Sequence, residues 1–394
     1  MKKIFFSLLL SLMTFSACAD VDFLTQPYLQ SLTPTSVTIM WVTSGNSQVT
    51  GWVEYGIGTC NTEAFEIDRG LKQAFTKNYR VHIDNLTPGT TYQYKALIRE
   101  ITGFVGNTSL TWGDTKESGV FTFTTPLVNQ DSISCLIFND IHSHPEFIQP
   151  LLSNNNLSFG EQDFVVFNGD ILNAVPNESE IVSNLLQPAI ANFASKKPFF
   201  FVRGNHEYRN KYARNLLNYI ETGEQNLGYY SFQYGPAFFI FLDTGEDKED
   251  THQEYNGLLA CEAYRRIQAQ WLQEQMTSEA YQNAKYRIVF MHIPMWSNTK
   301  TARFAVTDCR ELFLDIMNTY KPDVVISGHT HKAGVLEANE EHCFPIFIGG
   351  GKDTSEEKRT YCPSIMQLKV SNTELMLDLM NYYGENIGNL NLKK

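Results

Sequence analysis

Six short apolar segments, five of them followed at once by a polar motif, most restrict how this 394-residue chain can fold. Nearly all are continuously apolar, which is the pattern of strands buried on both faces of a sheet. Amphipathic stretches separate them, so we predict a layered α/β domain with crossover helices. The predicted strands are Ile133 to Asn139, Asp163 to Asn168, Pro198 to Arg203, Phe238 to Leu242, Tyr286 to Met291 and Val324 to Ser327. The predicted helices include Ile181 to Phe193, Ile267 to Met276 and Arg310 to Met317.

The chain between about Leu24 and Phe123 shows a different pattern, in which short segments alternate polar and apolar residues. Such alternation predicts strands with one buried face. A turn before Tyr92 puts this residue where a β-sandwich has a corner tyrosine, and the region resembles a fibronectin type III-like domain. Tyr55, Tyr92 and Tyr94 are expected to pack a core rather than to bind carbohydrate. The predicted strands are Ser36 to Trp41, Gly51 to Tyr55, Arg80 to Ile83 and Thr91 to Ala96.

The first residues predict export. Met1-Lys2-Lys3 and the apolar run from Ile4 to Phe15 have the charged and apolar parts of a signal peptide, and the run is too short to span a membrane as a helix. Cleavage at Ala17-Cys18-Ala19 would release a secreted or periplasmic protein. A lipobox ending at Cys18 would instead give a lipid-anchored protein of a bacterial cell envelope. We favour the lipoprotein and keep the secreted form as the alternative.

These patterns divide the chain into a signal peptide at 1–19, a β-sandwich at 20–125 and an α/β domain at 132–380. The formal net charge of −12 disfavours nucleic acid as a partner. The cysteines beyond Cys18 show no Cys-x-x-Cys spacing, so neither a zinc knuckle nor a redox pair is expected.

Five polar motifs directly follow predicted strands of the α/β domain. Because strand ends are where α/β sheets place their sites, we expect these motifs to meet. Five of the nine histidines in the chain fall within them, whereas surface or core histidines would be scattered. The motifs are Asp140-Ile141-His142, Gly169-Asp170, Gly204-Asn205-His206-Glu207, His292-Ile293-Pro294 and Gly328-His329-Thr330-His331.

Together the motifs offer imidazole nitrogens, two carboxylates and one asparagine carbonyl. This mixed set suits Mn, Fe or Zn better than Ca. A carboxylate can bridge two cations roughly 3.5–4 Å apart, as in two-metal hydrolases. Asp170, which lies between the other motifs along the chain, is the natural bridge.

The five motifs resemble those of the calcineurin-like metallophosphoesterases, and a small β-sandwich before the catalytic domain resembles the purple acid phosphatase branch. The resemblance covers most of the mature chain. It implies an N-terminal fibronectin III-like β-sandwich and an α/β layered domain whose β-sandwich core is flanked by helices. It implies one metal ion at Asp140, His142, Asp170 and His331, and a second at Asp170, Asn205, His292 and His329.

The resemblance also implies that the metals polarise the phosphoryl oxygens and acidify a bound water or hydroxide, which attacks phosphorus in line with the leaving alkoxide. His206 would stabilise the phosphoryl oxygens or protonate the leaving group, and a purely structural role is its alternative. We expect Glu207 and His144 to be structural. For Arg209 we expect a surface salt bridge rather than contact with phosphate.

One position departs from the purple acid phosphatase pattern. Members of that branch that resemble this chain carry a tyrosine, an Fe(III) ligand, three residues after the bridging aspartate, whereas this chain has Asn173. A purple ferric site is therefore not expected. The expected cofactor is a pair of divalent or mixed-valence ions of Mn, Fe or Zn. Without the tyrosine, a pair of Mn(II), Zn(II) or Fe(II) ions suits these residues better than a pair that contains Fe(III).

The resulting prediction is a phosphomonoesterase of broad specificity that acts on small phosphorylated substrates. A phosphodiesterase acting on nucleotides or lipid headgroups would share all of these motifs, because only the loops that shape its pocket would differ. A surface protein that binds a phosphorylated ligand without turnover is the third hypothesis. The complete ligand set argues against it.

Overall fold

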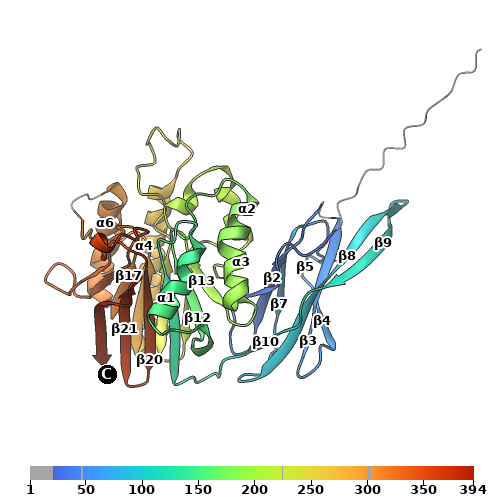
Figure 1. Cartoon of the computed structure of the whole chain (residues 1–394), viewed down its shortest axis with the longest axis horizontal. Helices are drawn as coiled ribbons and strands as arrows, with labels where there is room; N and C mark the ends of the chain where they lie inside the picture. Colours follow the sequence, from blue (N-terminus) through green and yellow to red (C-terminus); the bar gives the residue numbers. More distant parts are fainter. Residues whose placement is uncertain (1–20, 46–47, 224, 300–302) are drawn as a thin grey trace, which may run out of the picture.

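The computed structural model describes residues 21–45, 48–223, 225–299 and 303–394, which form two units side by side (Figure 1). The predicted signal peptide and Cys18 lie outside the described residues, so export stays a prediction. Within these four ranges, no helix is both long enough and apolar enough to cross a membrane. The six cysteines in the same ranges are free thiols.

The first unit is a β-sandwich, as predicted. Trp41 and Tyr79 stack in its core with ring centroids 5.0 Å apart, and Tyr92 and Tyr94 are buried in the same core. The hydroxyl of Tyr92 accepts a hydrogen bond of 2.9 Å from the backbone N–H of Thr87, which is the contact of a corner tyrosine. The aromatic residues of this unit therefore build its interior.

Two sheets and one small ladder make up this unit. The first sheet contains β1 (Tyr28–Gln30), β2 (Val37–Val42) and β7 (Asn78–Ile83). The second contains β3 (Val49–Gly56), β4 (Thr62–Ala64), β8 (Thr91–Val105), β9 (Ser109–Glu117) and β10 (Phe121–Thr124). The ladder pairs β5 (Ile67–Asp68) with β6 (Leu71–Lys72).

The second unit contains two six-stranded sheets. In order across the first sheet lie β13 (Phe199–Val202), β12 (Phe164–Asn168), β11 (Ser132–Phe138), β20 (Ser364–Ser371), β21 (Glu374–Asn381) and β22 (Asn386–Lys393). Across the second lie β14 (Tyr230–Tyr234), β15 (Ala237–Leu242), β16 (Tyr286–Met291), β17 (Val324–Ser327), β19 (Ile346–Ile348) and β18 (Gly334–Leu336).

All six predicted strands are present. β11, β12 and β13 run parallel in one sheet, and β15, β16 and β17 run parallel in the other. The sequence pattern predicted these strands but did not divide them between two sheets. It also missed the antiparallel strands β20, β21 and β22 at the end of the chain.

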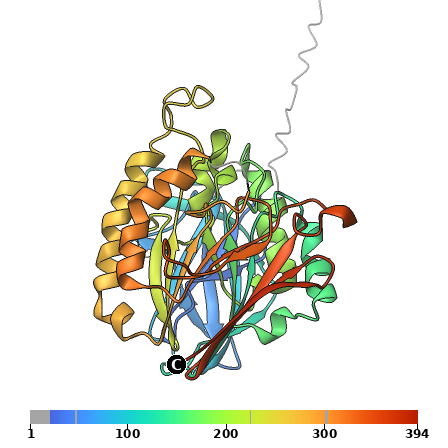
Figure 2. The ribbon, with the colours of Figure 1, turned by 90° about the vertical axis from the view of Figure 1, so that its left-hand side faces the viewer.

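Helices cover the outer face of each sheet, so the unit has four layers with the sheets in the middle (Figure 2). Over the first sheet lie η1 (Pro145–Phe147), α1 (Ile148–Asn154), η2 (Phe159–Glu161) and the continuous segment of α2 (Glu178–Ile181), η3 (Val182–Leu186), α3 (Gln187–Ala189) and η4 (Ile190–Ala194). Over the second lie α4 (Cys261–Thr277), α5 (Glu279–Asn283) and α6 (Phe304–Tyr320). Short turns of helix also occur at η5 (His206–Tyr208), η6 (Lys211–Asn218) and η7 (Glu356–Lys358).

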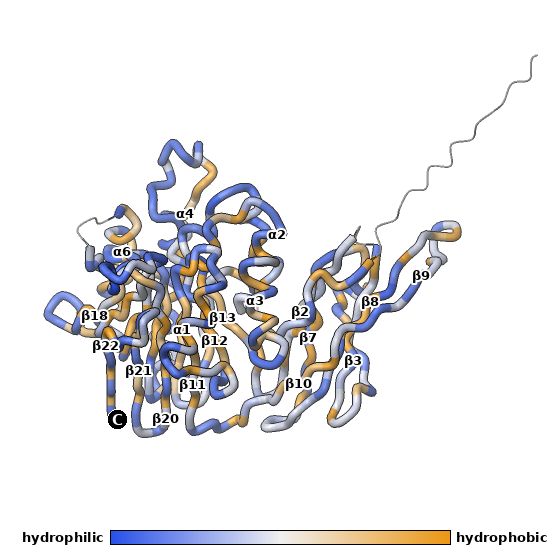
Figure 3. Tube along the Cα trace, in the orientation of Figure 1, coloured by the Kyte–Doolittle hydropathy of each residue, from blue (hydrophilic) through white to orange (hydrophobic). Residues whose placement is uncertain are grey.

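Apolar side chains fill the spaces between these layers. Figure 3 shows that hydrophobic residues concentrate in the strands, while the loops at the upper end of the second unit are largely hydrophilic. One buried cluster lies between the two sheets, and a further cluster lies between each sheet and its helices. The polar loops at the strand ends are thus held on a close-packed base.

The two units also share a buried contact. The Tyr28 hydroxyl donates to the Tyr219 carbonyl at 2.7 Å, and the Tyr94 hydroxyl donates to the Ser195 carbonyl at 2.8 Å. Tyr28 and Met40 of the sandwich belong to the same buried cluster as residues of β11, β12 and β13. The sandwich therefore packs onto the second unit rather than hanging from a linker.

Candidate metal centre

All five motifs lie directly after the carboxyl ends of parallel strands, as predicted. Three follow β11, β12 and β13 of the first sheet, and two follow β16 and β17 of the second. The site therefore forms where the ends of both sheets meet. Neither sheet alone carries the full set of predicted ligands.

The structure brings the predicted ligands together in two groups that share Asp170. In each group, one potential ligand atom from every residue lies within 4.8 Å of the others. Asn205 joins the second group, because its Oδ1 lies 2.8 Å from Nδ1 of His329. The first group is Asp140, His142, Asp170 and His331, and the second is Asp170, His292 and His329.

The contacts of His292 indicate that a cation fits here. Its Nδ1 lies 2.9 Å from the carbonyl oxygen of Asn168, which can only accept, so Nδ1 carries the hydrogen. The other nitrogen, Nε2, is buried without a hydrogen-bond partner, 3.2 Å from Asp170 Oδ2 and 3.9 Å from Asp140 Oδ1. Two buried carboxylates this close to one imidazole nitrogen call for positive charge, carried either by a proton on the ring or by a bound cation.

The electrostatics of the site agree with this reading. Burial lowers the pKa of His142 to about 2 and that of His329 to about 3, and it also lowers the pKa of His331. These imidazoles are therefore neutral near pH 7, as metal ligands must be. Burial acts to lower the pKa of His292 as well, but the carboxylates of Asp170 and Asp140 raise it to about 10. The centre of the site therefore favours positive charge.

The ligands project from turns with unusual backbone conformation. Asp140, His142, Asp170, His329 and His331 all have φ between 50° and 70°, in the left-handed region. For a residue with a Cβ this conformation costs roughly 1–2 kcal/mol. Such clusters occur where the surrounding structure imposes them, typically at functional sites.

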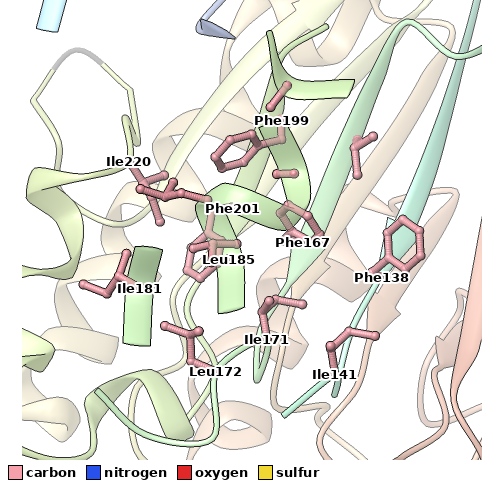
Figure 4. Close-up of a cluster of buried hydrophobic side chains, with 14 of the residues drawn as sticks. Phe138, Ile141, Phe167, Ile171, Leu172, Ile181, Leu185, Phe199, Phe201 and Ile220 are labelled. Atoms are coloured by element: carbon pink, nitrogen blue, oxygen red, sulfur yellow. The ribbon is translucent and has the colours of Figure 1, made fainter. Parts of the chain in front are cut away.

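Apolar residues inside the motifs anchor these turns. Ile141, between Asp140 and His142, and Ile171, after Asp170, are buried and point into the cluster beneath the site (Figure 4). A close approach at Gly328 is also required, because a Cβ there would lie 2.3 Å from Asp140 Oδ2. Apolar packing of Ile141 and Ile171 therefore anchors the turns that carry the polar side chains, and the backbone at Gly328 packs closely against Asp140.

Glu207 is structural, as expected, and its role is specific. Its buried carboxylate accepts hydrogen bonds from the backbone N–H groups of Asp170, Leu172 and Gly204, at 2.8, 2.9 and 2.7 Å. Burial and the neighbouring Asp170 raise the pKa of this carboxyl to about 7. Glu207 therefore ties the turn after β12 to the turn after β13.

His206 lies beside the two groups and lines a cavity of about 290 Å³ that opens at the site. Its Nδ1 lies 2.7 Å from the carbonyl oxygen of Asn173, so Nδ1 carries the hydrogen. Its Nε2 lies 3.9 Å from Asp170 Oδ2 and 2.7 Å from Nη1 of Arg209, which donates to it. The Asn173 carbonyl thus fixes the ring at Nδ1, and Nε2 faces the guanidinium group of Arg209.

Arg209 forms a salt bridge, as predicted, but not on an open surface. Its Nε lies 3.3 Å from Glu246 and its Nη2 lies 3.8 Å from Asp247, and both carboxylates are buried. Arg209 itself is partly exposed and lines the cavity at the site, so the salt bridge belongs to the cavity wall. The short distance in sequence between Asn205 and Arg209 indicated that Arg209 could lie near the site. The sequence alone could not show that Glu246 and Asp247 pair with its guanidinium group.

The side chains of two further residues, His144 and Asn173, lie outside the site, as predicted. His144 is partly exposed, and its Nδ1 lies 2.8 Å from Oε1 of Glu146. The side chain of Asn173 is exposed, and only its carbonyl contributes, to His206. Asp247 and Arg303, which pair with each other and line the cavity, were not predicted because no motif marks them.

Comparison with known proteins agrees with this geometry. The family model of the calcineurin-like phosphoesterases matches residues 133–333, just over half of the chain. The chain belongs to this family. A second model, of the purple acid phosphatase N-terminal domain, matches residues 25–125 of this phosphoesterase. The predicted family and fold are thereby confirmed, and the chain is a metallophosphoesterase.

The phosphoesterase is similar to several proteins over much of its length. It is 25% identical over 344 residues to purple acid phosphatase 22 of Arabidopsis thaliana, which covers 81% of this chain and 69% of that protein. It is 27% identical over 201 residues to serine/threonine-protein phosphatase CPPED1 of Rattus norvegicus, over 48% of this chain and 61% of that protein.

Solved structures support the same fold. Purple acid phosphatase PPD1 from yellow lupin (Lupinus luteus) superposes with a TM-score of 0.66 at 14% identity, over 93% of this chain and 74% of that one. PhoD superposes with a TM-score of 0.58 at 14% identity, over 94% and 89%. The order of a sandwich followed by a layered α/β domain is therefore a fold that other proteins share.

Proposed function

We propose that this phosphoesterase hydrolyses small phosphomonoesters with two metal ions. The observation that carries the proposal is that Asp170 belongs to both ligand groups, since one carboxylate within reach of two sets of imidazoles is what a two-metal site needs. One ion would be held by Asp140, His142, Asp170 and His331. The other would be held by Asp170, Asn205, His292 and His329.

The donor set favours Mn(II), Zn(II) or Fe(II). Imidazole nitrogens and carboxylate oxygens suit these ions, and the exposed Asn173 side chain supplies no phenolate for a ferric site. Two metal ions at these positions would supply Lewis acidity toward the phosphoryl group. The remaining chemistry falls to the residues of the cavity.

His206 is the residue we assign to proton transfer. Asn173 holds its Nδ1–H, so only Nε2 is free to exchange a proton with a substrate. We infer that a bound phosphate ester replaces the contact between Arg209 and this nitrogen. Nε2 would then take up a proton from solvent, giving the imidazolium, and pass it to the leaving alkoxide, while the guanidinium of Arg209 would neutralise charge on the phosphoryl oxygens.

Two features support a monoester over a diester. Two relatives, from Arabidopsis thaliana and Rattus norvegicus, are named as phosphatases. Arg209 and Arg303 line the cavity as hydrogen-bond donors for phosphoryl oxygens, and a monoester has three such free oxygens where a diester has two. A phosphodiesterase is the alternative, and the relative rates of monoester and diester hydrolysis distinguish the two activities.

The test combines metal analysis of protein purified without chelator with hydrolysis of para-nitrophenyl phosphate and of bis(para-nitrophenyl) phosphate. We expect two metal ions per chain, faster cleavage of the monoester, and loss of activity on chelation. Faster cleavage of the bis-ester would favour the phosphodiesterase. Protein that holds no metal and stays inactive after addition of Mn(II) or Zn(II) would favour a non-catalytic binding protein.

A further inference from the structure

A second hollow lies beside His331. It has a volume of about 480 Å³ and is lined by His331, Lys352, Asp353, Lys358 and Tyr361. His331 also lines the cavity at the candidate metal centre. The two hollows therefore meet at one predicted metal ligand. A phosphate ester whose phosphoryl group lies at the centre has room for its alcohol part in this second hollow.

The positive charges around the two hollows differ in how they are compensated. Arg209 and Arg303 face the buried carboxylates of Glu246 and Asp247. Compensation by a buried carboxylate reduces the charge that a substrate experiences.

In the second hollow, Lys358 is paired with Asp353 at 2.9 Å. Lys352 is exposed, and in the part of the chain that the structure describes it forms neither an ion pair nor a hydrogen bond. Lys352 is therefore an uncompensated cation beside the centre.

The backbone holds Lys352 in this position. Lys352 follows Gly349-Gly350-Gly351 at the end of β19. A Cβ at Gly351 would lie 2.5 Å from the Cβ of His331, so the chain just before Lys352 rests on the ligand itself. The N–H of Gly350 donates to the Ser364 hydroxyl at 2.8 Å, which fixes the turn to β20. The base of the lysine is thus held, while its long side chain stays free to reach a ligand.

We propose that Lys352 binds a second negative group on the substrate, so that the preferred substrates are phosphate esters whose alcohol part carries a carboxylate or a further phosphate. The inference rests on the proposed phosphomonoesterase function and narrows its substrate class. Lysine suits this task because an ammonium group acts as a flexible point charge toward anions. Because Lys352 is exposed, the effect is moderate and depends on salt.

Two esters that differ by one carboxylate test the inference: phenyl phosphate and 4-carboxyphenyl phosphate. With the metal-loaded protein at low salt, we expect a kcat/KM for the carboxylated ester about twofold to fivefold higher, the range of an exposed ion pair. Added salt should reduce this ratio, because it screens the charge. Lys352→Ala should abolish the preference, Lys352→Glu should reverse it, and Lys352→Arg should keep it.

Lys196→Glu is the matched control, because this exposed lysine lies before β13, at the end of the strand opposite the site. It makes the same change in net charge and should keep the preference. A ratio that is unchanged in both Lys352→Ala and Lys352→Glu would overturn the inference. An equal loss of the preference for the carboxylated ester in Lys196→Glu and Lys352→Glu would also overturn it, because the preference would then depend only on the net charge of the protein.

Failure of the proposed function would look different, since neither ester would be hydrolysed. Calorimetric binding of the two esters to the metal-loaded protein would then still test Lys352. Tighter binding of the carboxylated ester that depends on Lys352 would support the inference, and equal affinities would overturn it.

Discussion

Asp170 is the residue on which both ligand groups depend. Its buried Oδ2 lies 3.2 Å from His292 Nε2 and 3.8 Å from His142 Nε2, and its Oδ1 accepts a hydrogen bond from the backbone N–H of His206 at 2.8 Å. Asp170→Asn removes the negative charge that two cations would share. We expect metal content and phosphatase activity to fall together. Metal analysis with activity measurement checks this, with the exposed Asp84→Asn as control. Full activity with two metals retained would refute the shared role.

His206 is close to the two groups without belonging to either. We expect His206→Ala to keep both metals and to lower kcat by roughly 10²–10⁴-fold, the range for a lost proton donor. Metal analysis separates this from a structural defect, and His144→Ala, at a partly exposed histidine outside the two groups, is the matched control. Unchanged turnover would leave His206 with a structural role only.

At the scale of elements, the turns after the strands matter more than the strands themselves. Five predicted ligands have left-handed backbone conformations, and Glu207 ties two of these turns together through three N–H groups. A glutamine at position 207 would present an NH2 group to amides that need an acceptor. The ligand turns would then be held less firmly.

We therefore expect Glu207→Gln to weaken metal binding roughly 10–100-fold, the effect of losing a residue that orients metal ligands. Competition with a metal chelator measures this affinity. The matched control is Glu161→Gln, an exposed residue just before β12. Unchanged metal affinity in Glu207→Gln would show that the turns hold their conformation without it.

At the scale of the whole molecule, the sandwich stabilises the layered unit and does not build its site. None of the described residues of the sandwich lines the cavity at the metal centre. Its contacts with the layered unit include a shared core and two buried hydroxyl hydrogen bonds, from Tyr28 and Tyr94. Because the two units share one buried cluster, we expect them to unfold in a single transition.

Tyr94→Phe tests this coupling. It leaves the buried Ser195 carbonyl without its donor, which should lower the free energy of unfolding by about 1–3 kcal/mol. Calorimetry should show one transition at a lower Tm, with kcat and KM unchanged at 25 °C. Tyr383→Phe, whose hydroxyl bonds an exposed carbonyl, is the control. Two separate transitions would show that the units fold independently.

The local pattern of the sequence determined the strands, the ligand types and their order. A buried parallel strand is recognisable because it is continuously apolar, and a motif directly after it must lie at the strand's carboxyl end. This places Asp140, Asp170 and His292 at strand ends without any knowledge of their neighbours. The corner at Tyr92 was predictable for the same reason, since turn and tyrosine are adjacent in the chain.

Only the tertiary structure decided which groups face one another. The sequence could not divide the strands between two sheets, and so could not show that His331 and Asp140 approach from opposite sheets. It could not give His292 its tautomer, because Asn168 lies 124 residues away. Nor could it place buried carboxylates behind Arg209 or Lys352 beside His331. These contacts arise from the packing of two sheets, which joins residues that no local pattern connects.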